Sequence, residues 1–250
     1  MTERERALSF DAVADQYDKA RPGYPPALFD AIEELTGRPL AGSRVIDVGA
    51  GTGIATRLLR ARGALVTAVE PGPEMAARLH RAAPGVPLVR ALGDALPLAD
   101  GRADLITYAQ SWHWTDPARS VPEALRVLRP GGALALWWNI SDGTVPWIAA
   151  QAERIRRWAG DVHHGAHSAT GRARNLPAAL DRAERRIPWT RRVTLDTHLA
   201  NLGSHSVFRM RGEQAAAGFL ADERAELLTL FPDGTVEEAY AVELTVAAHA

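Results

Sequence analysis

Short apolar runs and helical stretches alternate along the first 140 residues of the chain. The apolar runs predict buried strands at 44–49, 64–70, 86–91, 103–111 and 133–140. Between them, the patterns at 51–63, 73–83 and 116–132 predict helices. Strands that are apolar throughout and that alternate with helices are typical of a parallel sheet covered on both faces. The pattern therefore predicts a doubly wound α/β fold.

The two ends of the chain differ from this alternation. Near the N-terminus, a helical pattern is interrupted by RPGYPP (21–26), since Pro and Gly end one helix and allow another to begin near Ala27. After residue 140, helices are expected near 145–159 and 177–185, with an irregular segment between them. RRVTLD and the segment 236–250 predict two closing strands that pair antiparallel. Neither repeats nor linkers interrupt the sequence, so we expect one domain with insertions.

Composition narrows the class of protein. The chain of 250 residues has no cysteine, which excludes disulfides, thiolate zinc sites and cysteine nucleophiles. The polar N-terminus has no signal-peptide pattern and no apolar run reaches the roughly 20 residues of a membrane span, so we expect a cytoplasmic enzyme without membrane contact. The net charge of −1 gives no reason to expect nucleic-acid binding.

Charge is spread unevenly in the second half of the chain. Residues 151–192 carry ten arginines against four acidic residues, and residues 193–250 carry three arginines against nine. Solvated surfaces explain such runs in most proteins. The alternative is a basic lobe that favours an anionic substrate.

The motif VIDVGAGTGIATRLL (45–59) carries the clearest chemical signal. An apolar strand leads through Gly49, Gly51 and Gly53 directly into a helix, so that backbone N–H groups can approach a ligand without side chains in the way. A dinucleotide site requires G-x-G-x-x-G, but here the third glycine comes one position early and Ile54 stands at the last position.

Two acidic residues follow the next two predicted strands. Glu70 ends the second strand, where a carboxylate can accept hydrogen bonds from both hydroxyls of a ribose. Asp94, in GDALPL, follows the third strand, where a carboxylate can meet an adenine amino group. Enzymes that use NAD share the loop and the first acid, but the second acid followed by A-L-P-L is not part of their pattern.

These motifs together resemble a known family. The motifs are DVGAGTG, VEPGPEM, GDALPL, the strand ending in AQSWHW, and LRVLRPGG followed by an apolar strand. Over about residues 40–140 they are similar to class I S-adenosylmethionine (SAM) dependent methyltransferases of the type 11, small-molecule subgroup. The leading FDAVADQYDKARPGYP resembles the N-terminal lid of the trans-aconitate methyltransferase group. The resemblance implies a Rossmann-like, seven-stranded, mostly parallel sheet. It also implies helices of a lid in 1–40, a SAM-binding core in 41–140, and a substrate cap, inserted after the fifth strand, with closing strands in 141–250.

The resemblance also implies roles for individual residues. Beneath the methionine part of SAM it places Gly49, Ala50, Gly51 and Gly53, and around the ribose and adenine it places Glu70, Pro71, Met75, Asp94 and Ala95. Gln110 and Ser111 would face the sulfonium, while Tyr17 and Arg21 would close over the cofactor, with Arg21 as a partner of its carboxylate. Each has a structural alternative, such as a strand cap for Glu70, a turn for Asp94 and core packing for Met75.

The motif AQSWHWTD (109–116) is the candidate acceptor site. His113 is the one plausible general base in the matched region, although a histidine that only forms part of the wall is an equal alternative. We expect the substrate to contact Trp112, Trp114 and Trp138, with Arg172, Arg174 and Arg209 as anion-binding candidates. The tryptophans can instead be core residues, and Trp137 and Trp138 should face opposite sides of the sheet.

Missing motifs narrow the chemistry. AQSW is not the Asn/Asp-Pro-Pro-aromatic pattern of enzymes that methylate nucleobases or amides, and no acidic set like that of catechol methyltransferases suggests a metal. HHGAH (163–167) is expected to be a loop over the site rather than a ligand cluster.

We therefore expect SAM as cofactor and S-adenosylhomocysteine (SAH) as product, with no metal. The acceptor would be a small molecule of secondary metabolism or another biosynthetic pathway, methylated at a carboxylate or hydroxyl oxygen, and the protein a monomer or homodimer. N- or C-methylation, a non-catalytic SAM-binding protein and a nucleotide-dependent oxidoreductase are the alternatives.

Overall fold

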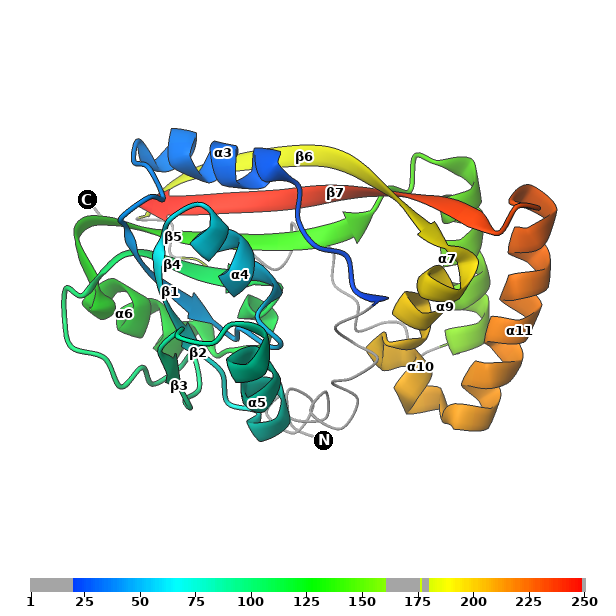
Figure 1. Cartoon of the computed structure of the whole chain (residues 1–250), viewed down its shortest axis with the longest axis horizontal. Helices are drawn as coiled ribbons and strands as arrows, with labels where there is room; N and C mark the ends of the chain where they lie inside the picture. The colour runs from blue at the N-terminus through cyan, green and yellow to red at the C-terminus, as the bar shows by residue number, and fades with distance from the viewer. Residues whose placement is uncertain (1–19, 161–175, 177–179, 249–250) are drawn as a thin grey trace.

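The computed structural model describes residues 20–160, 176 and 180–248. They form one seven-stranded sheet in the order β3-β2-β1-β4-β5-β7-β6, with helices on both faces (Figure 1). β1 to β5 pair in parallel, whereas β7 runs antiparallel to both of its neighbours. The predicted doubly wound, mostly parallel fold is confirmed.

The predicted alternation of strands and helices up to residue 140 is also confirmed, except that residues 128–132, which were expected in a helix, begin β5. The strands are β1 (Arg44–Val48), β2 (Leu65–Val69), β3 (Leu88–Val89), β4 (Ala103–Ala109) and β5 (Leu128–Ser141). The helices are α3 (Pro26–Thr36), α4 (Ile54–Ala61), α5 (Pro73–Ala82) and α6 (Pro117–Val127). Proline occupies the first turn of α3, α5 and α6, where its missing N–H costs no hydrogen bond.

Apolar side chains of the parallel strands alternate between two cores. On one face, α6 packs through Val121 and Val127 against β1, β4 and β5. On the other face, α3 and α4 pack against the same strands. Trp138 lies in the first core and Trp137 in the second, as the period of two along a strand requires.

The closing part of the chain differs from the sequence-based prediction. We expected a helix at 177–185, but residues 181–185 belong to β6 (Asp181–Thr194), which pairs along its whole length with β7 (Thr235–Ala248). Ala, Arg and Glu at 181–186 favour a helix by propensity. The pairing with β7 outweighs this local preference because a strand gains its stability from its neighbours. The predicted antiparallel pairing of the two closing segments is correct.

Four helices form a separate layer at one end of the sheet, which we call the cap. They are α7 (Pro146–Ala159), α9 (Leu195–Gly203), α10 (Ser206–Arg211) and α11 (Glu213–Leu230). Only the first of these was predicted as a helix. Figure 1 shows the cap beyond the carboxyl ends of β5 and β6, and its apolar centre contains Leu195, Leu199, Leu227 and Val236.

The basic run of the sequence is largely paired with acids from other segments. On β6, Arg185 pairs with Glu34 of α3, Arg186 with Asp142, and Arg191 with Glu238 of β7. On α7, Arg154 pairs with Glu223 of α11. In the described residues, these arginines therefore join β6 to α3, to the end of β5 and to β7, and join two helices of the cap, instead of forming an unpaired basic lobe.

Within the described ranges, no helix combines the length and the apolar character that crossing a membrane requires.

Asp47 is a fully buried carboxyl group in the middle of β1. It accepts hydrogen bonds from Thr56 of α4 at 2.6 Å and from Thr107 of β4 at 2.9 Å. Burial raises the pKa of Asp47 above its ordinary value, although the two hydroxyl donors oppose the shift. The native state therefore keeps this proton to a higher pH than the unfolded chain does.

The raised pKa of Asp47 predicts a pH dependence of stability. As pH rises from the ordinary carboxyl range of about 4 toward neutrality, Asp47 lowers the free energy of unfolding, because the unfolded state loses its proton first. Asp47→Asn should remove this contribution, so the free energy of unfolding of the variant should improve relative to wild type between pH 4.5 and 7.5 in urea titrations. Asp30→Asn, on the exposed side of α3, is the control. A difference that is constant with pH would contradict the assignment.

Candidate functional site

The carboxyl ends of β1 and β4 meet at the point where the order of the sheet reverses. From β1 the chain continues to β2 and β3 on one side, while β4 and β5 lie on the other. Ligands of open α/β sheets bind at this reversal, outside the carboxyl ends of the strands. Residues 49–53 follow β1, and residues 110–114 follow β4, so the two motifs singled out in the sequence are neighbours here.

The glycine loop has a backbone that other residues rarely adopt. Gly49, Gly51 and Gly53 have φ values of 67°, 57° and 87°, all in the left-handed region. The loop is fixed to β2, because the N–H groups of Gly49 and Ala50 both donate to the carbonyl of Val69, at 2.8 and 3.1 Å.

Ser111 locks the loop to the end of β4. Its hydroxyl donates to the carbonyl of Val48 at 2.5 Å, and a Cβ on Gly49 would overlap the Cβ of Ser111. By contrast, apart from its two chain neighbours, no atom of the described residues lies within 4 Å of the position where Gly51 would carry a Cβ. The loop is thus closely packed on one side and open on the other.

Glu70 joins the glycine loop to the turn after β2. Its two carboxylate oxygens accept hydrogen bonds from the backbone N–H groups of Gly51, at 2.7 Å, and Gly72, at 2.8 Å. Beside this turn lie Pro71, which is partly buried, and Met75, which is buried at the start of α5.

Asp94 is tied to the start of α6. Its Oδ1 accepts from the backbone N–H of Asp116 at 3.0 Å and from the hydroxyl of Ser120 at 2.8 Å. Asp94 and the exposed Ala95 line one wall of a hollow of about 490 Å³, whose other wall is α6. Asp94 therefore has the turn role that the sequence left open, and it also borders this hollow.

Gln110 has a strained backbone at the end of β4. Its φ of 57° is the one positive value of a non-glycine residue in the described chain, a conformation that costs roughly 1–2 kcal/mol. Its N–H donates to the carbonyl of Trp137 at 2.8 Å, and its side-chain amide donates to the Tyr24 hydroxyl at 3.4 Å. Such strain persists where the surroundings hold it, and it gathers at functional sites.

The tryptophans of AQSWHW divide between core and site. Residues 112–114 form one 3-10 turn, in which Trp112 is 1% exposed and packs edge-on against Tyr108. Trp138 is also buried, so both rings are core residues, which was the alternative to a substrate wall. His113 and Trp114 are partly exposed, with ring centroids 4.4 Å apart.

A hydrogen bond from Trp138 constrains the protons of His113. The Trp138 indole N–H donates to Nδ1 of His113 at 3.4 Å. Because Nδ1 acts as the acceptor, the neutral ring carries its proton on Nε2. Nε2 is therefore a donor in this arrangement. Nδ1, the ring nitrogen without a proton, faces the indole of Trp138.

Other predicted residues lie in or beside the part of the chain without a described structure. Tyr17, Arg172, Arg174 and the segment His163–His167 lie outside the described residues, and the side chain of Arg209 is not described. Arg21 lies in the segment before α3. Burial lowers the pKa of His205 to about 3, with a further contribution from the Arg21 charge, which indicates that Arg21 lies near the cap.

Sequence reasoning missed several polar residues around this site. Asp47 is visible in the sequence as an acidic residue within an apolar strand, but its buried hydroxyl partners are not. Asn139, Trp189, Arg191 and Glu238 depend on the register of β5, β6 and β7, which no local pattern reveals.

Comparisons with known proteins agree with this arrangement. A family profile described as a methyltransferase domain matches residues 46–136, which include the glycine loop and β4. An uncharacterized methyltransferase of Mycobacterium tuberculosis strain H37Rv is 44% identical over 154 residues, which are 62% of this chain and 61% of that protein. A demethylmenaquinone methyltransferase of Corynebacterium kroppenstedtii is 35% identical over 138 residues, or 53% and 59% of the two chains.

A solved structure extends the likeness to nearly the whole chain. A protein of Anaeromyxobacter dehalogenans, described as a candidate type II methyltransferase, has a TM-score of 0.66 and 25% identity, and the match covers 91% of this chain and 97% of that one. The matches to the two curated relatives span only about three fifths of their length.

The close packing of Gly49 predicts a difference between two glycines. Gly49→Ala and Gly51→Ala both place a side chain at a positive φ, which costs about 1–2 kcal/mol, but only the first meets the Ser111 Cβ. Overpacking should add about 1–3 kcal/mol to the loss of unfolding free energy of Gly49→Ala. Urea titration measures both, and Gly49→Ala combined with Ser111→Gly should recover part of the extra loss. Equal losses for the two single variants would refute the packing argument.

Proposed function

We propose that this chain, whose residues 46–136 match a methyltransferase-domain profile, is a class I methyltransferase that binds SAM and transfers its methyl group to a small-molecule acceptor. The observation that carries the proposal is the glycine loop at the reversal of the sheet. It is packed against Ser111 on one side, joined to Glu70, and open above Gly51. The residues present fit the cofactor, since an open glycine backbone and a carboxylate beside it suit a zwitterionic chain and a ribose.

SAM supplies an activated methyl group on a sulfonium when it is bound. The residues of this chain then have to position the acceptor, align it and exclude water, and effective molarities from such positioning provide roughly 7–11 kcal/mol of a barrier. Gly49 to Gly53 with Ala50 would hold the methionine part, and Glu70, Pro71, Met75, Asp94 and Ala95 the ribose and adenine. Gln110 and Ser111 would face the reacting end.

We infer that the acceptor atom is an oxygen, and within that class we favour a carboxylate. A carboxylate is nucleophilic without losing a proton, whereas a hydroxyl or an amine needs a base. The hydrogen bond from Trp138 supports this choice, because it occupies the nitrogen of His113 that would otherwise accept a proton. His113 would then contact the acceptor as a donor through Nε2, with Trp114 beside it.

The relatives support a small acceptor in biosynthesis. The Corynebacterium relative is a demethylmenaquinone methyltransferase by name, and demethylmenaquinone is a small molecule. We expect the reaction to need no metal and no nucleic acid, and we expect a cytoplasmic monomer or homodimer. N- and C-methylation and a non-catalytic SAM-binding role are the alternatives that a transfer screen across carboxylates, phenols and amines would separate.

Binding of the cofactor is the first test. By calorimetry, wild type should bind SAM and SAH with a Kd in the micromolar range, about −8 kcal/mol, and should not bind NAD. Glu70→Gln should weaken SAH binding by about tenfold, because it removes a charged acceptor at the ribose. Glu74→Gln, on the exposed first turn of α5, should leave the Kd unchanged. No binding of either SAM or SAH by wild type would reject the proposal.

Substitution of His113 tests the role of the acceptor site. His113→Gln keeps an N–H donor, so with the best acceptor from the screen kcat should stay within about threefold of wild type. His113→Leu removes the donor and should lose about tenfold, as expected for one hydrogen bond. The Kd for SAH should not change in either variant. A loss of about a hundredfold or more in His113→Gln would instead identify His113 as the general base.

A further inference from the structure

A short segment before α3 connects the two halves of the molecule. Residues Ala20–Tyr24, which we call the strap, run from beside the cap toward the start of α3 (Figure 1). The segment contains Pro22 and is followed by Pro25, and neither proline can donate a backbone hydrogen bond. Hydrogen-bond donors from other segments can therefore hold the strap best by donating to its oxygen atoms.

Three donors from three regions of the sheet hold the strap through its oxygens. The Arg191 guanidinium on β6 donates to the carbonyl of Ala20 at 2.8 Å, and the Asn139 amide on β5 donates to the carbonyl of Gly23 at 2.8 Å. Just after β4, the Gln110 amide donates to the hydroxyl of Tyr24 at 3.4 Å.

The two donors to the strap backbone are themselves held in place. The Trp189 indole N–H donates to the side-chain oxygen of Asn139 at 3.0 Å, which orients the amide so that its N–H₂ faces Gly23. Arg191 pairs with the buried Glu238 at 2.5 Å and lies over the ring of Tyr240, 5.9 Å from its centroid. Both side chains are thus pre-oriented before any ligand binds.

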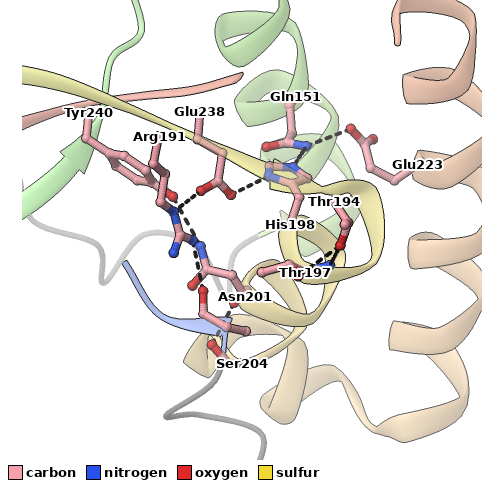
Figure 2. Close-up of polar contacts among 11 residues, drawn as sticks. Gln151, Arg191, Thr194, Thr197, His198, Asn201, Ser204, Glu223, Glu238 and Tyr240 are labelled. Carbon is pink, nitrogen blue, oxygen red and sulfur yellow. Dashed lines mark hydrogen bonds and ion pairs between the residues drawn. The ribbon is translucent and has the colours of Figure 1, made fainter. Parts of the chain in front are cut away.

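Figure 2 shows that the ion pair of Arg191 continues into the cap. The other oxygen of Glu238 is 2.7 Å from Nδ1 of His198 on α9, and the far nitrogen of that ring is 2.9 Å from the amide of Gln151 on α7. The same amide donates to Glu223 of α11. The position of the strap is therefore tied to three helices of the cap as well as to the sheet.

We propose that Asn139 and Arg191 are positioning residues that hold the strap over the methionine end of the cofactor. The inference rests on the proposed function and on the role that the family resemblance implies for Arg21, as the partner of the cofactor carboxylate. Ordering a free backbone costs about 1–2 kcal/mol per residue, and a strap that is held in advance spares the ligand this cost. In the proposed function the adenosine end of the cofactor would be held by Glu70 and Asp94, which follow β2 and β3.

The test compares two ligands that share the adenosine end. Asn139→Ala and Arg191→Ala should each weaken SAH binding by at least about tenfold, and adenosine binding by less than about threefold, in calorimetric titrations of the full chain. Arg185→Ala is the matched control, because Arg185 also lies on β6 but pairs with Glu34 on the surface. It should change neither Kd. Hydrogen exchange of the ligand-free proteins should be faster at the amides of Arg21, Gly23 and Tyr24 in the two variants only.

Two further variants address folding. Arg191→Ala leaves the buried Glu238 without its ion pair, so thermal unfolding is measured for each protein, and Arg191→Lys should recover part of the SAH affinity by restoring the charge. Trp189→Phe removes only the indole donor that orients Asn139, and should weaken SAH binding without weakening adenosine binding.

The outcomes separate the two hypotheses. If wild type binds SAH and the variants match it, or if they lose SAH and adenosine affinity equally, the strap inference is wrong while the proposed function stands. If wild type binds neither SAH nor adenosine, the proposed function is wrong, and the strap inference, which rests on it, is wrong as well.

Discussion

The contact between the glycine loop and the end of β4 is the constraint on which the rest of the structure depends. Ser111 occupies the space where any other residue at position 49 would place a Cβ, and its hydroxyl holds the last carbonyl of β1. The two strands that border the reversal of the sheet are thereby fixed at their carboxyl ends. Glu70 then connects the open side of the loop to the turn after β2, so that the walls of the candidate site are set by hydrogen bonds between side chains and backbone groups.

The cap adds a second, polar layer to this backbone frame. Arg191, Glu238 and His198 form a buried series of charged and polar contacts between β6, β7 and α9. Buried ion pairs contribute little net stability after desolvation, but removal of one partner is costly, so they favour one arrangement over others. In this protein the arrangement that they favour brings the cap, the sheet and the segment before α3 together at the same edge.

The sequence predicted the parallel core well because its signals are local. An apolar strand, a glycine loop and an acid after each of two strands are read from neighbouring residues, and the fold places them as expected. The helix expected at 177–185 was wrong in 181–185, since the register of β6 against β7 is decided by residues about 60 positions away. For the same reason Asn139 and Arg191 carried no sequence signal, and the burial of Trp112 and Trp138 could not be separated from a place in the site wall.

Among the described residues, β6 is an edge strand of 14 residues, and the edge of a sheet can serve as a template for a second chain. Its outward positions discourage such growth, since the strand carries charged side chains and Pro188, which has no N–H to offer a further strand. Two of these arginines also hold other segments, since Arg185 pairs with Glu34 of α3 and Arg191 donates to the carbonyl of Ala20 in the strap. Protection against edge-to-edge aggregation and cohesion of the fold are thus supplied by some of the same side chains, so that their replacement would affect both solubility and the packing of the chain.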